Sequence, residues 1–249
     1  MSFFSLSASP VCTLPVPQHV ACRQFLVAGL ASGSRILDVG CGHGELMADL
    51  GSRGMRTSGV EVDKRLVAAC CERGLAVRFG MAESLPFSDG EFDAIVSSVV
   101  LPYTDQRKAL REFTRVLRPG GVMNLTCHGV GYGLHYALAE RGMRIYGLRM
   151  LANTVVYSVT GLRLPGFVGD TLCQTQGAIQ SYAGENSLEL RETFVVDHYR
   201  GLARFIGFRL QKPGSVKISR EATAILEQAG TEQNPVEAWI PAVSNLAEH

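Results

Sequence analysis

The sequence lacks an excess of charge of either sign, and it lacks a long apolar run. Its 249 residues include 24 lysines and arginines against 23 aspartates and glutamates, which gives a formal net charge of +1. The whole chain therefore produces no field that would attract nucleic acid. No run of about 18 uncharged apolar residues occurs, so no membrane-spanning helix is expected. Apolar residues make up 46% of the chain, which excludes a mainly disordered protein and predicts a substantial core.

The seven cysteines form no recognisable metal-binding or disulfide pattern. Their number is odd, no Cys-x-x-Cys occurs, and no nearby pair of histidines completes a zinc site. No lysine or arginine precedes Arg23, so the positively charged start of a secretory signal is missing. We therefore expect free thiols in a cytoplasmic protein, with no metal ion.

Between residues 35 and 127, short β-branched runs alternate with helical patterns. The runs predict strands, and the apolar periodicity predicts a helix after each of the first, second and fourth of them. Asp63 and Gly74 bracket one of these helices as its cap and its stop. This alternation predicts an α/β fold with a doubly wound, mostly parallel sheet, and ligands are expected at the carboxyl ends of its strands. The predicted strands are 35–39, 57–61, 76–79, 92–98 and 122–127, and the helices are 45–53, 64–73 and 105–117.

The rhythm changes after residue 128. Residues 129–169 predict a helical insertion over the site, with helical stretches on either side of Gly147 and up to Gly161. This insertion is locally basic, because Glu140 is its only acid against four arginines at 141, 144, 149 and 163. A helix over 171–182 and two strands over 188–196 and 203–210 are expected to follow. We predict one domain over 1–213 and a C-terminal appendage over 214–249.

Three glycines at alternate positions follow the first predicted strand, in Asp38-Val-Gly40-Cys-Gly42-His-Gly44. Glycines between a strand and a helix let backbone approach a ligand closely. Glu61 ends the next strand, where an acid can bind the two hydroxyls of a ribose. A dinucleotide motif would place its third glycine at position 45, which is Glu45 here, so an NAD-dependent oxidoreductase is disfavoured. Asp38, beside the loop, suits a cationic ligand group better than a pyrophosphate.

With these residues, the chain resembles the class I S-adenosylmethionine-dependent methyltransferases of the small-molecule type, over about residues 30–127 and more weakly to 213. The resemblance implies a seven-stranded Rossmann-like sheet, with the helical insertion after the fifth strand, and S-adenosylmethionine as the cofactor. It implies that the glycine loop contacts the methionine part of the cofactor, that Glu61 binds the ribose and that Val62 lies beside the adenine. The loop residues concerned are Asp38, Gly40, Cys41, Gly42 and Gly44.

One departure from the family pattern lies in the adenine region. The family commonly has aspartate after the glycine that corresponds to Gly80, and this chain has Met81. We therefore expect backbone groups of Met81 and Ala82, next to Glu83, to hold the adenine together with apolar packing. The missing hydrogen bond would weaken cofactor binding by about 1 kcal/mol.

The candidate catalytic residues follow the fourth and fifth predicted strands. In methyl transfer the cofactor carries the reactive group, so the protein supplies alignment, a dry site and sometimes a base. Ser97 and Ser98 end the fourth strand and are expected next to the cofactor. His128, at the end of the fifth strand, is the candidate general base, and Tyr103 is the candidate for orienting the acceptor. Either residue could instead line the pocket, and a strongly nucleophilic acceptor would need no base.

These observations favour methyl transfer to an oxygen or nitrogen of a small, partly apolar metabolite. Two alternatives stay open, namely carbon methylation of a prenylated or quinone-like substrate and a non-catalytic, cofactor-binding partner subunit. A nucleic-acid acceptor is less expected, because no basic stripe with interleaved aromatics occurs. The segment that follows the fourth strand, Ser97-Ser-Val-Val-Leu-Pro-Tyr103, also lacks an amino-methylating Asn-Pro-Pro-Tyr motif. An N-terminal helix over 18–30 is expected to close over the cofactor.

Overall fold

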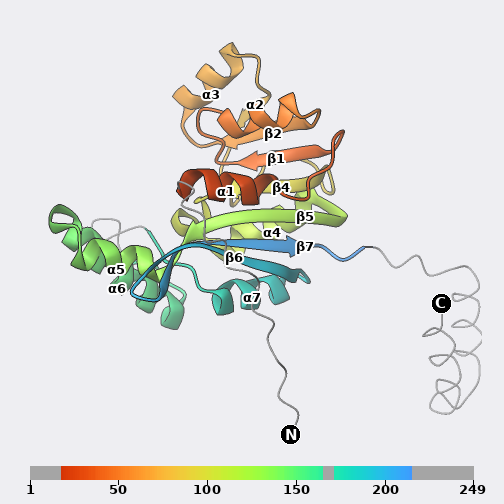
Figure 1. Cartoon of the computed structure of the whole chain (residues 1–249). Helices are drawn as coiled ribbons and strands as arrows, with labels where there is room; N and C mark the ends of the chain where they lie inside the picture. The colour runs from red at the N-terminus through yellow and green to blue at the C-terminus, as the bar shows by residue number, and fades with distance from the viewer. Residues whose placement is uncertain (1–17, 165–170, 215–249) are drawn as a thin grey trace, which may run out of the picture. The chain divides into compact units, whose positions relative to one another are not determined.

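The computed structural model describes residues 18–164 and 171–214, and within them seven strands form one sheet in the order β3-β2-β1-β4-β5-β7-β6 (Figure 1). The first five strands pair in parallel, whereas β7 is antiparallel to both β5 and β6. The predicted doubly wound, mostly parallel fold is therefore confirmed. All of the predicted appendage over 214–249 except Gly214 lies outside the described residues. The strands are β1 Arg35–Val39, β2 Arg56–Glu61, β3 Val77–Phe79, β4 Phe92–Ser98, β5 Leu117–His128, β6 Glu189–Tyr199 and β7 Leu202–Gln211.

Helices cover both faces of this sheet, which explains why its central strands are apolar on both sides. Leu37 packs into the core cluster shared with α4 and α7, while its neighbour Ile36 packs on the opposite face with Leu26 of α1 and Leu50 of α2. In the described residues, no helix is both long and apolar enough to cross a membrane. The helices are α1 Gln18–Val27, α2 Glu45–Ser52, α3 Lys64–Glu72, η1 Leu101–Tyr103, α4 Gln106–Val116, α5 Val130–Leu138, η2 Arg141–Met143, α6 Arg144–Thr160 and α7 Gln176–Glu185.

Local signals in the sequence place several helix ends correctly. Asp63 caps α3 by accepting a hydrogen bond from the Arg65 amide at 2.8 Å, and Asp105 caps α4 through the Lys108 amide at 3.2 Å. Side-chain oxygens at this position satisfy amides that have no partner inside the helix. The structure therefore confirms α3 and α4 where the sequence predicted them.

The insertion differs from its prediction at Gly147, which does not separate two helices. Gly147 lies inside α6, and a Cβ there would approach the Gly133 carbonyl oxygen of α5 to 2.6 Å. The glycine is thus a point of close helix–helix approach rather than a helix breaker. The break falls instead at residues 139–143, between α5 and α6. The next helix also starts later than predicted, because Thr175 is its cap.

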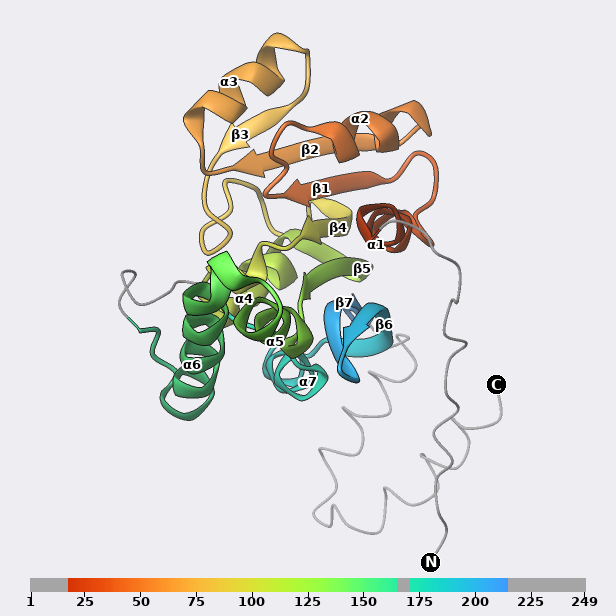
Figure 2. The same cartoon turned by 60° about the vertical axis from the view of Figure 1, so that its left-hand side comes forward.

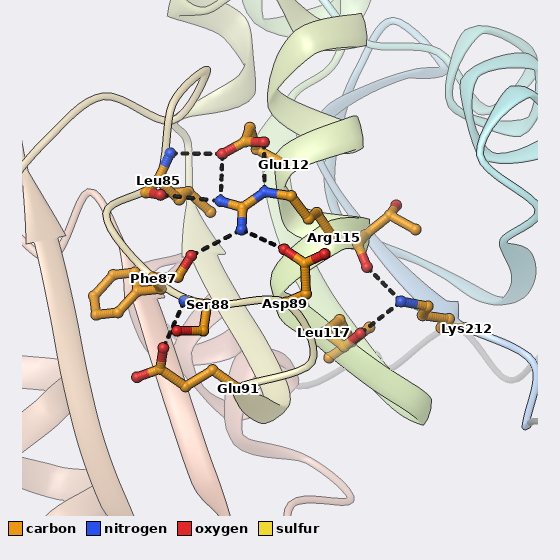
Figure 3. A network of polar contacts seen from close by, with 10 residues as sticks. Leu85, Phe87, Ser88, Asp89, Glu91, Glu112, Arg115, Leu117 and Lys212 are labelled. Atoms are coloured by element: carbon orange, nitrogen blue, oxygen red, sulfur yellow. Dashed lines mark hydrogen bonds and ion pairs between the residues drawn. The ribbon is translucent and has the colours of Figure 1, made fainter.

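Arg115 of α4 fixes the loop that leads from β3 toward β4 (Figure 3). Its guanidinium donates to both carboxylate oxygens of Glu112 and to Asp89, each at 2.8 Å. It also donates to the carbonyl oxygens of Leu85 and Phe87, at 3.0 and 2.8 Å. Three of these five hydrogen bonds therefore anchor residues 85–89, just after the predicted adenine region, and the two to Glu112 orient a carboxylate that accepts from the Leu85 amide at 2.8 Å.

Replacing Arg115 by methionine should lower the free energy of unfolding by about 2–3 kcal/mol, since hydrogen bonds to charged groups are lost and carbonyl groups lose their donor. The control is Arg118→Met, whose 2.9 Å ion pair with Asp93 is more exposed and should cost less than about 1 kcal/mol. Urea unfolding of both variants measures the difference. Equal losses would contradict the anchoring role.

The same network predicts a pH dependence. Hydrogen bonds from Arg115 hold the pKa of Glu112 below its ordinary value. Stability from a carboxylate with a depressed pKa is present above its unfolded pKa and is lost as pH falls. The difference in free energy of unfolding between wild type and Arg115→Met should therefore become smaller below about pH 4.

Candidate functional site

Two neighbouring pockets flank the glycine loop at the carboxyl ends of β1, β2 and β4. The first, here called the α1 pocket, has a volume of about 650 Å³ and lies between α1, the loop, the end of β4 and Phe205 of β7. The second, the β2 pocket, has a volume of about 420 Å³ and lies between Gly40, Glu61, residues 80–83 and the segment after β4. Val99 lines both pockets. This is the edge of the sheet where the strand pattern predicted ligand binding.

The three loop glycines all have a positive φ, but they face different surroundings. A Cβ on Gly40 would collide with Val100, and one on Gly44 would collide with Leu75. A Cβ on Gly42 would meet no described atom within 4 Å. Close packing by the protein itself therefore explains Gly40 and Gly44, whereas the space in front of Gly42 is open. Gly40 lines the β2 pocket, and neither Gly42 nor Gly44 lines either pocket.

Glu61 links the loop to the β2 pocket. One carboxylate oxygen accepts from the Gly42 amide at 2.9 Å, and the other accepts from the amides of Val62 and Asp63 at 2.8 and 3.1 Å. The residue is 9% exposed and lines the β2 pocket, as does Val62. The structure thus brings the predicted ribose acid to a pocket wall, in an orientation fixed by three backbone donors.

Asp38 lies buried at the end of β1 and lines neither pocket. Burial, followed by the nearby Glu61 carboxylate, raises the pKa of Asp38 to about 7, while the Arg23 cation acts in the opposite direction. The folded protein therefore holds a proton on Asp38 over a pH range in which the unfolded chain has released it. A cationic group bound nearby would favour the ionised form.

Replacing Asp38 by asparagine should stabilise the folded protein at neutral pH relative to wild type. The pKa of Asp38 is about 4 in the unfolded chain and about 7 in the folded protein. The stability that the protonated Asp38 gives to wild type is therefore complete below about pH 4 and is lost as the pH rises through about 7. The free energy of unfolding of the variant, relative to wild type, should rise by up to about 1.4 kcal/mol per pH unit in this range. Urea unfolding at a series of pH values measures this slope. An advantage that does not change with pH would show that Asp38 does not titrate there.

The residues predicted to hold adenine lie together in the β2 pocket. Met81 is exposed there, and Ala82 is buried. Glu83 also lines the pocket, but its carboxylate accepts from the Asp105 amide at 2.8 Å, at the start of α4. A second role for Glu83 is therefore to join the pocket wall to α4.

The two serines at the end of β4 have different surroundings. The Ser97 hydroxyl donates to the Val39 carbonyl oxygen at 3.1 Å, and the residue is buried and lines neither pocket. Ser98 lines the α1 pocket and accepts a hydrogen bond from the Thr126 hydroxyl at 3.4 Å. Ser97 therefore ties β4 to β1 instead of presenting its side chain to a ligand. Cys41 also lines the α1 pocket, and burial raises its pKa to about 12.

His128 lies at the end of β5, buried among aromatic rings. Its imidazole stacks on Tyr132 with 3.8 Å between ring centroids, and Tyr103 and Phe205 contact it edge-on at 6.4 and 5.5 Å. Burial lowers the pKa of His128 to about 4, and its Nδ1 has no hydrogen-bond partner among the described residues. The imidazole is therefore neutral near pH 7 and can accept a proton, although with a small driving force. Tyr103 is half exposed at the rim of the β2 pocket.

Arg23 and Phe205 are the α1-pocket residues of most chemical interest that sequence reasoning missed. Arg23 reaches this pocket from α1, with its guanidinium 2.9 Å from the Glu45 carbonyl oxygen and 3.4 Å from Asp49. Arg23 lies in the N-terminal helix that was expected to close over the cofactor, and this position could have indicated that it reaches the site. Phe205 enters because β7 pairs with β5, opposite His128. The sequence carries no local signal for that pairing.

Comparison with known proteins identifies methyltransferases as similar to this chain. Residues 37–125 match the family described as methyltransferase domain. A malonyl-[acyl-carrier protein] O-methyltransferase of Dechloromonas aromatica is 34% identical over 115 residues, covering 43% of this chain and 42% of that protein. A tRNA (carboxymethyluridine(34)-5-O)-methyltransferase of Xenopus tropicalis is 37% identical over 99 residues, covering 38% of this chain and 15% of that protein. The chain thus spans less than half the length of these curated relatives.

The fold has solved counterparts. The crystal structure of a SAM-dependent methyltransferase from Methanosarcina mazei superimposes with a TM-score of 0.57 at 20% identity. The superposition covers 75% of this chain and 95% of that one. At this identity the match shows the fold alone, and it agrees with the observed strand order.

Proposed function

We propose that this chain, which carries a class I S-adenosylmethionine-dependent methyltransferase domain, transfers a methyl group to an oxygen or nitrogen of a small, partly apolar acceptor. The observation that carries the proposal is the pair of pockets on the two sides of the glycine loop. One contains the carboxylate suited to a ribose, and the other contains a guanidinium near a buried carboxylate. This arrangement matches a ligand with a nucleoside half and an amino-acid half.

The described residues fit the cofactor at both halves. The β2 pocket offers Glu61 to the ribose hydroxyls and an apolar wall at Met81 and Ala82 to the adenine. The α1 pocket offers Arg23 to a carboxylate, and Asp38 gives a negative charge that favours a cation nearby. When bound, S-adenosylmethionine supplies an electrophilic methyl group on a sulfonium.

The acceptor side is formed by the aromatic residues at the end of β5. His128 contacts the rings of Tyr103, Tyr132 and Phe205, and Tyr132 also contacts Phe205. The neutral imidazole of His128 is able to take the proton of a hydroxyl or amine acceptor. An aromatic wall also suits a partly apolar acceptor.

The test is a screen for transfer of a labelled methyl group from S-adenosylmethionine to cell-extract fractions, followed by mass identification of the product. The fractions should include tRNA and acyl-carrier proteins, since relatives are named for such acceptors. A labelled carbon on a quinone-like product would favour the alternative of carbon methylation. Cofactor binding without transfer to any fraction would favour a non-catalytic partner subunit. Tight binding of NAD, with no binding of S-adenosylhomocysteine, would refute S-adenosylmethionine as the cofactor.

Arg23→Gln should weaken binding of S-adenosylhomocysteine about tenfold, because one charge-assisted hydrogen bond to the ligand carboxylate is lost. Binding of 5′-methylthioadenosine, which has no amino-acid part, should stay unchanged. The matched control is Arg53→Gln, because Arg53 also pairs with Asp49, at 3.1 Å, but lines neither pocket. If the variant bound both ligands more weakly by the same factor, Arg23 would support the fold of the pocket and not contact the ligand carboxylate.

A further inference from the structure

The outer side of α6 carries a line of exposed apolar side chains, here called the α6 face. Its members follow one another at alternate spacings of three and four residues, which places them on one side of a helix. Nothing in the described part of the chain covers them, and Val159 is 81% exposed and Ile145 67%. The α6 face consists of Ile145, Leu148, Ala152, Val155 and Val159, with Leu162 just beyond the helix.

The opposite side of α6 is already used in packing. Gly147 and Met150 are buried toward α5, and α5 in turn packs against β7. Figure 2 shows this order, with α5 between α6 and the β6–β7 hairpin. A helix that is apolar on both sides is normally buried on both sides. Scattered exposed apolar residues are ordinary, but a continuous line of them marks an interaction site.

The charged residues of α6 and its preceding turn are all positive, and two carboxylates lie beyond the ends of the face, Glu140 before Arg141 and Asp105 in a surface pocket with Val159. Arg141, Arg144 and Arg149 are exposed, and residues 141–164 contain no aspartate or glutamate. An apolar helix face flanked by arginines suits an anionic lipid surface. A second copy of the same face would bring three more exposed arginines, while Glu140 and Asp105 already have His135 and Lys108 as neighbours in their own chain. Charge complementarity therefore disfavours a dimer through α6.

The inner side of α6 is linked to the acceptor side of the proposed site by a chain of ring contacts. Tyr146 of α6 contacts Tyr136, which contacts Tyr132, and Tyr132 stacks on His128. At the other end of the helix, Arg163 donates to the Pro102 carbonyl oxygen at 3.1 Å, next to Tyr103. The helix pair with the apolar outer face is therefore also in contact, through its inner aromatic side chains, with the proposed base His128.

We propose that the α6 face docks the protein on an anionic bilayer surface, with α6 lying in the headgroup plane and its arginines on lipid phosphates. Apolar side chains enter the acyl boundary in this arrangement, and the helix does not span the bilayer. Resting on the proposed function, this docking would place the acceptor wall next to molecules dissolved in the membrane. Lipid binding itself is independent of methyl transfer.

The experiment is vesicle co-sedimentation of the full chain without cofactor, so that its outcome does not depend on the proposed activity. We expect binding to phosphatidylcholine vesicles that contain about 30% phosphatidylglycerol, much weaker binding to phosphatidylcholine alone, and loss of binding at high salt. The double variant Val155→Asp with Val159→Asp should lower the affinity at least about tenfold. Its control is Leu202→Asp, an exposed leucine on β7.

A second pair of variants tests the charges. Arg144→Gln with Arg149→Gln should lower the affinity about fivefold for each arginine removed. Arg56→Gln with Arg65→Gln, which removes two exposed arginines of β2 and α3, has the same net charge and should bind as wild type does. Circular dichroism of all variants checks that they fold.

Three results would overturn the proposal. The first is wild-type protein that does not bind anionic vesicles, and the second is binding that survives both α6 double variants. The third is a dimer, seen by size-exclusion chromatography, that the aspartate variant separates without any vesicle binding, because a second copy would then be the occupant.

Discussion

Replacing Glu61 by alanine should weaken binding of S-adenosylhomocysteine by about 3 kcal/mol, roughly 150-fold in Kd. Two effects add up in this variant. The ribose loses its carboxylate partner, and the amides of Gly42, Val62 and Asp63 lose the acceptor that fixes the loop between the two pockets. Isothermal titration calorimetry measures the change.

Two further variants separate these effects. Glu61→Gln keeps one carbonyl oxygen for the backbone amides and should lose less affinity than alanine does. Glu83→Gln is the matched control, because Glu83 lines the same pocket but directs its carboxylate to the Asp105 amide. It should change Kd by less than about fivefold. An unchanged Kd in Glu61→Ala would remove Glu61 from the ribose site.

The parts of the fold that local chemistry determines could be predicted from the sequence. β-branched runs mark the strands, and Asp63 and Asp105 cap helices with their own side chains. The strand-loop-helix order then places Gly40 and Glu61 at one edge of the sheet, because the carboxyl ends of parallel strands meet there. The carboxylate and the loop can be expected together without knowledge of the packing.

The remainder depends on contacts between segments far apart in the chain. Glycine commonly interrupts a helix, and only the close approach of α5 explains why Gly147 lies within α6. His128 could be located at the end of β5, but its stacking on Tyr132 and the low pKa that burial gives it could not. Phe205 joins the site through a strand pairing that no local pattern encodes. Sequence patterns therefore predicted the placement of the glycine loop and Glu61 better than the aromatic surroundings of His128.

Within the five residues of the glycine loop, too, the sequence predicts some features and only the packing reveals others. The spacing of its glycines indicates close approach to a ligand, and it does not distinguish one glycine from another. In the structure, Gly44 contacts the protein's own core, where a Cβ would collide with Leu75 and lie 3.3 Å from the Cys70 sulfur. Gly42 faces open space and donates its amide to Glu61. Side chains at these two positions should therefore damage different properties of the protein.

Gly42→Val should abolish detectable binding of S-adenosylhomocysteine, a loss of at least about 100-fold, while the protein still folds. Its side chain would enter the open space in front of the loop, and although Gly42 lines neither pocket, we propose that the bound cofactor reaches this space between its two halves. The positive φ of +55° should cost about 1–2 kcal/mol of stability. Gly44→Val should instead lower the free energy of unfolding by about 3 kcal/mol or more, from overpacking and from strain at φ +74°. Thermal unfolding and calorimetric titration of both variants measure the two properties. Normal binding by folded Gly42→Val would show that the cofactor does not occupy the space in front of the loop, and the assignment of the loop would be wrong.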